Sequence, residues 1–198
     1  MNTTRVARIA LPLAAASLSL AGCIKFGAEP PASLLTLQPA QSVAVGQTQT
    51  APAAKTITIA VPSVPQEIAT LRVPVRSSAT SIAYVKDAQW VEPPNRLFAR
   101  LLSDTVASRT GRVVAGNRMI ADPGATLSGE LRSFGIDAAS ASAVVTFDAA
   151  LQRDSGAALE KRRFEARVPT AIEAGAVGAA LNQAANQVAG EVADWVGR

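Results

Sequence analysis

Few side chains in this sequence could perform chemistry. The 198 residues include a single cysteine, Cys23, and no histidine. This composition excludes Ser–His–Asp triads, Cys–His pairs and the usual zinc ligand sets. Carboxylate pairs for glycoside hydrolysis can be drawn from Asp104 with Glu130 or Asp137 with Asp148, but their spacing does not support that chemistry. The sequence therefore predicts a protein that is not an enzyme and that holds neither a metal nor a dissociable cofactor.

Cys23 follows a secretory leader. Residues 1–8 carry Arg5 and Arg8 and no acid, and residues 9–20 are uncharged. That apolar run is shorter than the roughly 20 residues of a membrane-spanning helix, so the pattern is typical of a signal peptide. Residues 20–23, Leu-Ala-Gly-Cys, resemble the lipobox of bacterial lipoproteins. The resemblance implies a diacylglycerol on the Cys23 thiol, cleavage before Cys23 and an acyl chain on the new amine.

The alternative is an ordinary signal peptide cut nearby, which would leave a free or buried cysteine. A lone thiol in an oxidising compartment is a liability, which disfavours that alternative. Ile24 stands where an aspartate would retain a lipoprotein in the inner membrane of enteric bacteria. By resemblance to that rule, we expect a lipid-anchored protein at the periplasmic face of the outer membrane.

The chain divides into a leader at 1–22, a lipidated tether at 23–33 and one domain at 34–198 that includes a flexible loop at about 39–55. Two of the 19 basic residues leave with the leader, so 17 face 15 acidic residues in the mature chain. The remaining basic residues are scattered rather than gathered in a patch. Nucleic acid is therefore not expected as a partner.

The first half of the domain predicts short strands and a helix. Ile57, Ile59 and Val61 alternate with smaller residues, which predicts a strand that ends at Pro62. LRVPVRSS and SIAYVKDAQWV are two further extended segments. A helix is expected after the two prolines at 93–94 and before Gly111, with an apolar stripe that comprises Leu97, Leu101, Leu102, Thr105 and Val106.

The second half predicts three strands within 126–136, 143–153 and 161–169, the last two joined as a hairpin by the turn at 154–157. A C-terminal helix follows, with Thr170 and Glu173 as a capping box. Its apolar stripe comprises Val177, Leu181, Ala184, Val188, Val192 and Trp195. The fold expected is α+β: a single domain with a mostly antiparallel sheet and two main helices on one face.

The middle of the chain resembles a known family. Residues 56–65, TITIAVPSVP, and residues 73–106 contain a strand before a proline turn, an arginine after an extended segment, and a tyrosine before Trp-x-Glu-Pro. These features resemble the ABC-type transport auxiliary lipoproteins, which are partners of paraquat-inducible and other mammalian-cell-entry (MCE) transport systems. The motif residues here are Arg76, Tyr84, Trp90, Glu92 and Pro93.

The resemblance implies an adaptor for the transport of lipids or toxic solvents between the two membranes. Its partners would be an MCE-domain periplasmic protein, an inner-membrane permease and an ATPase, and copies of the chain would self-associate. Two alternatives stay open. One is a periplasmic carrier that itself holds a phospholipid, and the other is a structural lipoprotein of another envelope complex.

The motif residues have structural as well as functional interpretations. Trp90 and Tyr84 are either interface anchors or core residues, and the core is the preferred interpretation. Arg76 is expected to pair with Glu92 inside the fold. EKRRFEAR, at 160–167, is interpreted as a solvated strand face. The stripe on the C-terminal helix suits core packing better than a lipid groove, because its side chains are small.

Overall fold

The computed structural model describes residues 33–116, 122–153, 156 and 158–198. The predicted leader, Cys23 and the tether up to residue 32 lie outside these residues. Within the described part of the chain, no helix is both long enough and apolar enough to cross a membrane.

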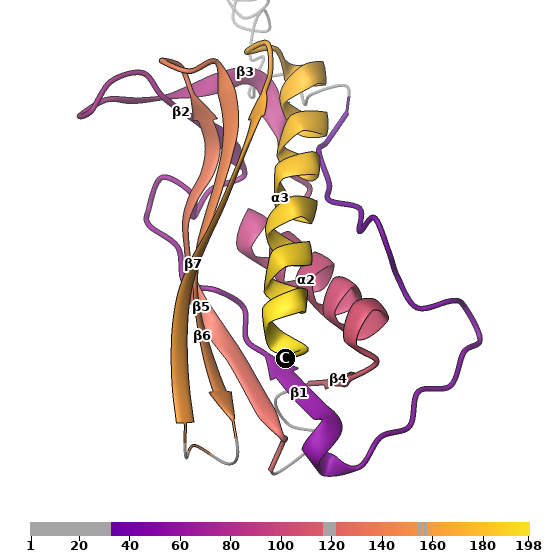
Figure 1. Ribbon diagram of the computed structural model, residues 1–198. Helices are drawn as coiled ribbons and strands as arrows, with labels where there is room; N and C mark the ends of the chain where they lie inside the picture. The colour runs from indigo at the N-terminus through magenta and orange to yellow at the C-terminus, as the bar shows by residue number, and fades with distance from the viewer. Residues whose placement is uncertain (1–32, 117–121, 154–155, 157) are drawn as a thin grey trace, which may run out of the picture. The chain divides into compact units, whose positions relative to one another are not determined.

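The sheet is built around its longest strands. The seven strands are β1 (Thr56–Ile59), β2 (Arg72–Arg76), β3 (Ile82–Gln89), β4 (Val113–Ala115), β5 (Ala125–Asp137), β6 (Ser142–Arg153) and β7 (Ala158–Pro169). The long β5–β6 and β6–β7 pairs are antiparallel, as is β2–β3. The expected α+β fold is confirmed, and so is the 142–169 hairpin (Figure 1).

Short parallel pairs complete the sheet, and the sequence did not predict them. β1 pairs with one end of β5 at Ile57 and Ala125, whereas β2 pairs with the other end at Val75 and Ile136. β1 also pairs in parallel with β4. β5 therefore carries β6 along one edge and shares its other edge between β1 and β2.

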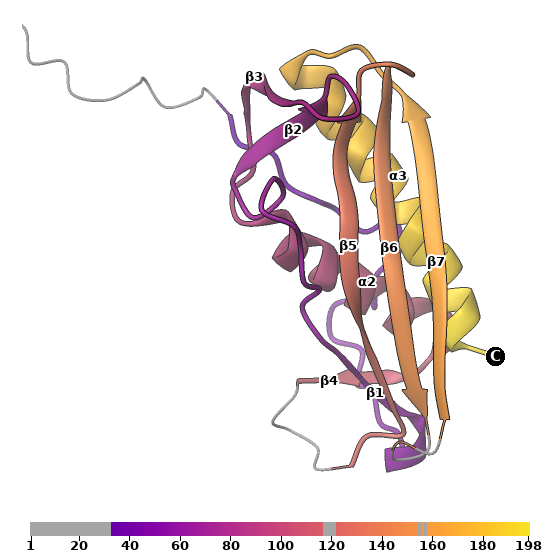
Figure 2. The ribbon, with the colours of Figure 1, turned by 90° about the vertical axis from the view of Figure 1, so that its left-hand side faces the viewer.

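Two helices, α2 (Pro94–Thr110) and α3 (Ala174–Val196), pack on one face of the sheet, as predicted. Figure 2 looks onto the opposite face, which no helix covers and which we call the open face. α2 has Pro94 in its first turn, where a missing N–H costs nothing. It ends at Gly111, whose φ of 67° is left-handed, so the predicted C-terminal stop is confirmed.

The predicted capping box of α3 is wrong. Glu173 is the N-cap residue, and its side chain makes no capping hydrogen bond. The Thr170 backbone N–H instead donates to the Ala141 carbonyl at 2.9 Å, and the Thr170 hydroxyl donates to the Ala171 carbonyl. Thr170 thus directly follows β7 and ties the end of this strand to the β5–β6 turn.

Small residues let α3 approach the sheet closely. Five alanines of this helix are at most 6% exposed: Ala180, Ala184, Ala185, Ala189 and Ala193. They pack in one cluster with sheet residues such as Phe147 and Phe164. Among the described residues, side chains therefore fill the layer between the helices and the sheet.

Arg153 fixes the end of α3 to β6. Its guanidinium donates to the Trp195 and Val196 carbonyls, both at 3.3 Å, and to Glu160 at 3.0 Å. These are terminal carbonyls that the helix itself cannot satisfy.

The segment predicted as a flexible loop, about 39–55, carries one 3-10 helix, η1 (Ala53–Lys55). Its start is attached to α3, because the Ala40 N–H donates to the Asn186 side-chain oxygen at 2.7 Å and Asn186 donates back to the Gln38 carbonyl at 2.9 Å. Its flexibility stays a prediction.

Candidate functional site

A cleft opens on the open face of the sheet beside the β2–β3 hairpin, and we call it the sheet cleft. Its volume is about 100 Å³. Apolar residues and the backbone of β5 form much of its lining, while arginines and acids surround it. The lining includes Glu67, Ile68, Pro74, Arg76, Ile82, Arg132, Phe134, Gly135, Asp137, Val144 and Arg167.

A glycine in β5 brings the walls of the cleft together. A Cβ at Gly135 would lie 2.5 Å from the Pro74 carbonyl oxygen, which is closer than real Cβ contacts allow. Only a residue without a side chain lets β2 approach β5 this closely. Gly135 therefore allows β2 of the β2–β3 hairpin to pack closely against β5 at the edge of the open face.

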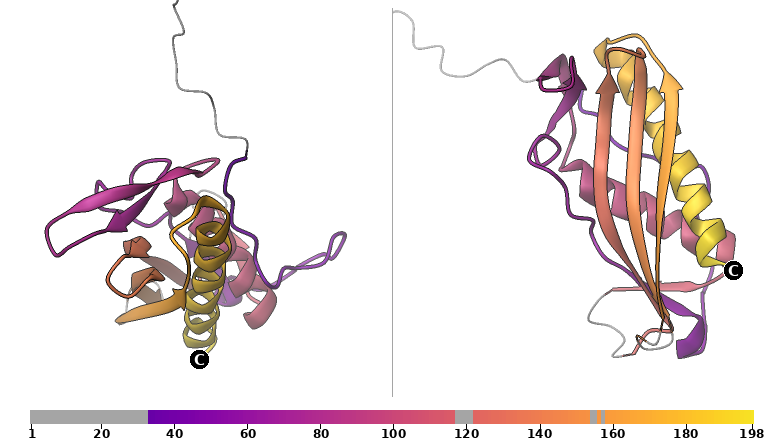
Figure 3. Two further views of the ribbon diagram at one scale, coloured as in Figure 1. Left: turned by 90° about the horizontal axis from the view of Figure 1, so that it is seen from above. Right: turned by 60° about the vertical axis from the view of Figure 1, so that its left-hand side comes forward.

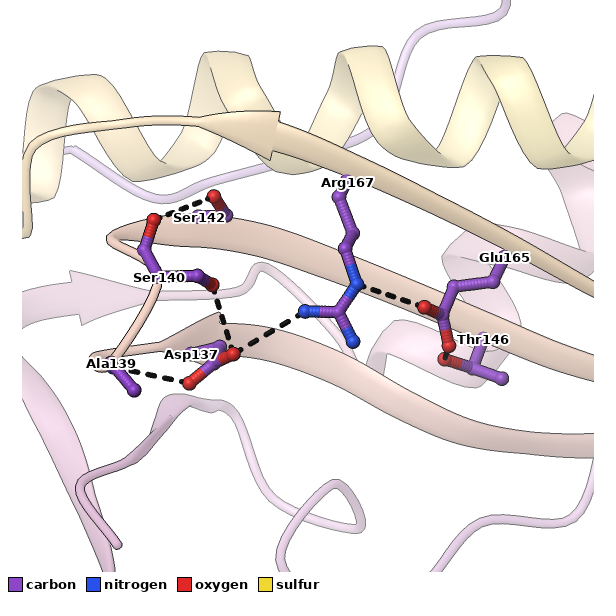
Figure 4. Close-up of polar contacts among 7 residues, drawn as sticks. All are labelled: Asp137, Ala139, Ser140, Ser142, Thr146, Glu165 and Arg167. Carbon is purple, nitrogen blue, oxygen red and sulfur yellow. Dashed lines mark hydrogen bonds and ion pairs between the residues drawn. The ribbon is translucent and has the colours of Figure 1, made fainter.

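A hydrogen-bonded turn closes one end of the cleft (Figure 4). The Asp137 carboxylate accepts from the Ser140 hydroxyl at 2.8 Å, from the Ala139 N–H at 3.1 Å and from the Arg167 guanidinium at 3.3 Å. These donors, Ser140 first, hold the pKa of Asp137 below its ordinary value of 3.8. The turn between β5 and β6 is thereby tied to β7.

The network continues across the sheet through Arg167. This side chain also donates to Glu165 at 2.8 Å, and Glu165 accepts from the Thr146 hydroxyl at 2.9 Å. Partial burial acts to raise the pKa of Glu165, but the hydrogen bonds from Thr146 and Arg167 outweigh it and lower the pKa. Charged groups of β5 and β7 and a hydroxyl of β6 are thus linked on the open face.

Acid should weaken this network. A carboxylate whose pKa is depressed in the folded state stabilises the fold above its ordinary pKa and loses that contribution as the pH falls through the folded value. We expect Asp137→Asn to lower the melting temperature at neutral pH, and the difference from the wild type to shrink toward about pH 3.

Thermal unfolding of the two proteins over this pH range measures the effect. Glu191→Gln is the matched control, because Glu191 is exposed on α3 and makes no ion pair within the described residues. A gap between wild type and Asp137→Asn that stays constant with pH would contradict the assigned role of Asp137.

Two arginines at the cleft are held only loosely. Arg76 lies 3.7 Å from Glu67, and Arg132 lies 3.8 Å from Glu130 and 3.7 Å from Asp148. The side chains of both arginines are about half exposed, at 48% and 50%. Exposed pairs at these distances contribute little to stability, so both guanidinium groups can exchange their partners for others.

The expected pair of Arg76 with Glu92 is wrong. Arg76 pairs with Ile82 at the start of β3, whereas Glu92 follows the end of that strand. The far end of β3, Gln89, pairs with Arg72, four residues of β2 away from Arg76, which corresponds to roughly 13 Å. Glu92 instead forms an ion pair with Arg100 of α2, whose hydrogen bond lowers the pKa of Glu92. Pro93 is the N-cap residue of α2.

The two aromatic motif residues lie in different environments. Trp90 is 0% exposed, and its ring centroid lies 5.4 Å from that of Phe134. Its indole N–H finds no hydrogen-bond acceptor among the described residues. Tyr84 is half-buried, and the Arg72 guanidinium carbon lies 4.2 Å from its ring centroid. Trp90 is thus a core residue, while Tyr84 faces a cation near the surface.

The carboxylate pairs considered for hydrolysis are not brought together. Asp137 pairs with Ser142 and Asp148 pairs with Glu130, so six residues of β6 separate the two aspartates by roughly 20 Å. Asp104 lies on α2, whereas Glu130 belongs to β5. No group of acids in the described residues could hold a metal ion.

The sequence did not predict the sheet cleft. A glycine inside a strand, here Gly135, does indicate a close approach of another backbone. It does not reveal which segment approaches, since β2 pairs with β5 across 60 residues of intervening chain.

Comparisons with known proteins agree with this fold. A family model described as "ABC-type transport auxiliary lipoprotein component" matches residues 35–193. A crystal structure of protein XCC0632 from Xanthomonas campestris, of family DUF330, is 24% identical with a TM-score of 0.63, over 84% of this chain and 92% of that one.

A second crystal structure, of an uncharacterized protein, is 18% identical with a TM-score of 0.64, over 72% of this chain and 92% of that one. At these identities, both structures show a shared fold. No curated protein matches the chain.

Proposed function

The chain belongs to the family of ABC-type transport auxiliary lipoproteins, and from this premise we propose that it is the outer-membrane adaptor of an MCE-type lipid transport system. The family is one of transport-associated lipoproteins and is not a class of enzymes. The adaptor would hold an MCE-domain periplasmic protein, served by an inner-membrane permease and an ATPase, at the outer membrane.

The filled layer between helices and sheet is the observation that favours an adaptor over a lipid carrier. A carrier needs an apolar cavity that can take an acyl chain. The side chains that would line such a cavity are instead packed against one another: Val177, Leu181, Leu127, Leu151 and Phe98 are all at most 1% exposed.

The anchor of the adaptor would be acylated Cys23. One acyl chain holds a protein at a membrane only marginally, whereas two or more hold it stably. The diacylglycerol and the amide-linked acyl chain expected on Cys23 therefore suffice to keep the domain at the outer membrane. The 11 residues from Cys23 to residue 33 would serve as its tether.

The sheet cleft is the surface that we assign to the MCE protein. It combines apolar lining with two half-exposed guanidinium groups whose acid partners lie 3.7–3.8 Å away. A protein segment with an aliphatic side chain beside a carboxylate would complement it in both respects. The carboxylate would take Arg76 or Arg132 from its distant partner, and the aliphatic group would cover Ile82, which is 38% exposed.

Charge reversal at the cleft tests this assignment. We expect Arg76→Glu to reduce the amount of MCE protein that co-purifies with the tagged, lipidated chain from detergent-solubilised envelope, because it replaces attraction with repulsion. The loss should be larger at low salt than at high salt.

Lys55→Glu is the matched control, since Lys55 is exposed on η1 and the charge change is the same. Equal loss of the MCE protein with both variants would contradict the assignment of the sheet cleft as the binding surface. Recovery of phospholipid without any MCE protein would favour the carrier, and recovery of another envelope machine would favour the structural lipoprotein.

A further inference from the structure

We infer that one end of the domain lies directly against the lipid bilayer. The surface concerned is formed by Leu34, Leu71, Arg72, Tyr84 and Val91, and we call it the tether-end surface. The inference rests on the proposed lipid anchor and adds to it an orientation of the domain and a second, non-covalent contact with lipid.

Hydrogen bonds place the three segments of this surface side by side. The Leu35 N–H donates to the Gln89 carbonyl at 2.7 Å, and the Val91 N–H donates to the Leu35 carbonyl at 2.9 Å. On the other side of the same strand end, the Trp90 N–H donates to the Leu71 carbonyl at 2.7 Å. The first described residues, the end of β3 and the start of β2 thus form one continuous strip.

Large aliphatic side chains are left in solvent along this strip. Leu34 is 49% exposed, Val91 is 50% exposed and Leu71 is 42% exposed. Single exposed hydrophobic residues are ordinary, but several in adjacent segments indicate a contact surface. Seen from above in the left panel of Figure 3, the β2–β3 hairpin extends to one side of α3.

Arg72 and Tyr84 give the surface the composition of a membrane interface. The Arg72 guanidinium lies over the Tyr84 ring, and no carboxylate pairs with it within the described residues. Arginine and tyrosine each combine an apolar body with a polar end, and they favour the boundary between lipid tails and headgroups. An unpaired guanidinium can also bind a lipid phosphate.

The short length of the tether favours lipid over another protein as the partner of the tether-end surface. Residue 33 lies ten positions after Cys23, and ten residues of fully extended chain span at most about 35 Å. Leu34 is the next residue, so the exposed aliphatic groups begin where the anchor holds the chain nearest to the bilayer. Leu159, which is 63% exposed, lies instead at the start of β7, on a distant strand of the sheet (Figure 1).

Spin labels on the mature, lipidated protein test the inference. Acylation of Cys23 leaves no free thiol, so a cysteine introduced as Val91→Cys or Leu34→Cys is labelled alone. Leu159→Cys is the control, because it too replaces an exposed aliphatic residue. The labelled proteins are placed in vesicles of phosphatidylethanolamine and phosphatidylglycerol, and the accessibility of each label to oxygen and to a water-soluble nickel chelate is compared by power saturation.

We expect the ratio of oxygen to nickel accessibility in the vesicles to be higher at positions 34 and 91 than at position 159. Equal ratios at all three positions, in protein that floats with the vesicles, would overturn the inference and leave the anchor intact. Protein that does not float with the vesicles would overturn the anchor and the inference together.

Discussion

Replacing Cys23 with alanine is expected to abolish the lipid anchor entirely. Without the thiol, no thioether to diacylglycerol can form, and cleavage at the lipobox-like site does not follow. Cells fed an alkyne fatty acid should label the wild-type protein and not Cys23→Ala. The variant should also lose the outer-membrane density of the wild type on a sucrose gradient.

Ile24→Asp separates lipidation from sorting. This variant keeps Cys23, so it should still take up the fatty acid. If the enteric retention rule applies, the aspartate should move it to the inner membrane. A wild-type protein that takes up no fatty acid would contradict the lipoprotein assignment of Cys23, whatever the result with Ile24→Asp.

Replacing Trp90 with alanine is expected to cause the largest loss of stability. The side chain is 0% exposed and contacts Phe134 at a centroid distance of 5.4 Å. Truncating a buried tryptophan costs about 3–5 kcal/mol, because apolar contacts are lost and a cavity remains. The free energy of unfolding, measured with urea on the purified protein, should fall by about this amount.

Trp90→Phe serves as the comparison. It keeps an aromatic ring in the core and removes the indole N–H that finds no acceptor in the described residues. Its cost should therefore be clearly smaller than that of alanine. A Trp90→Ala protein with unchanged stability that no longer co-purified with its partner would contradict the core assignment and make Trp90 an interface anchor.

The local patterns of the sequence predicted the elements of the fold well. Period-two alternation gave β1, β5, β6 and β7, and the stripe at spacings of three and four gave α3, whose predicted apolar residues are all buried. Pro94 and Gly111 bound α2 as expected. These predictions succeed because each depends on residues that are neighbours along one element.

The failures concern pairs of residues that are distant in the fold or in the chain. Arg76 lies opposite the start of β3 and Glu92 follows its end, so the strand keeps them apart. Thr170 was expected to cap α3, but its N–H is taken by Ala141 of another turn. The parallel pairing of β2 with β5, which builds the sheet cleft, likewise depends on a contact that no local pattern carries.

The adaptor and the carrier would use different parts of the domain. An adaptor would bind protein at the sheet cleft, and it would contact lipid through its anchor and the tether-end surface. A carrier would have to open the layer between α3 and the sheet, where Ala184, Ala185 and Ala189 are 0% exposed. Opening that layer would expose apolar surface to water at considerable cost.

Photo-crosslinking in intact cells tests the adaptor most directly. A benzophenone amino acid would replace Ile82, which lines the cleft and is 38% exposed, with Val45 on the 39–55 segment as the control position. We expect an adduct between position 82 and an MCE-domain protein that position 45 does not give. An adduct of position 82 with phospholipid alone, or with a component of another envelope machine, would contradict it.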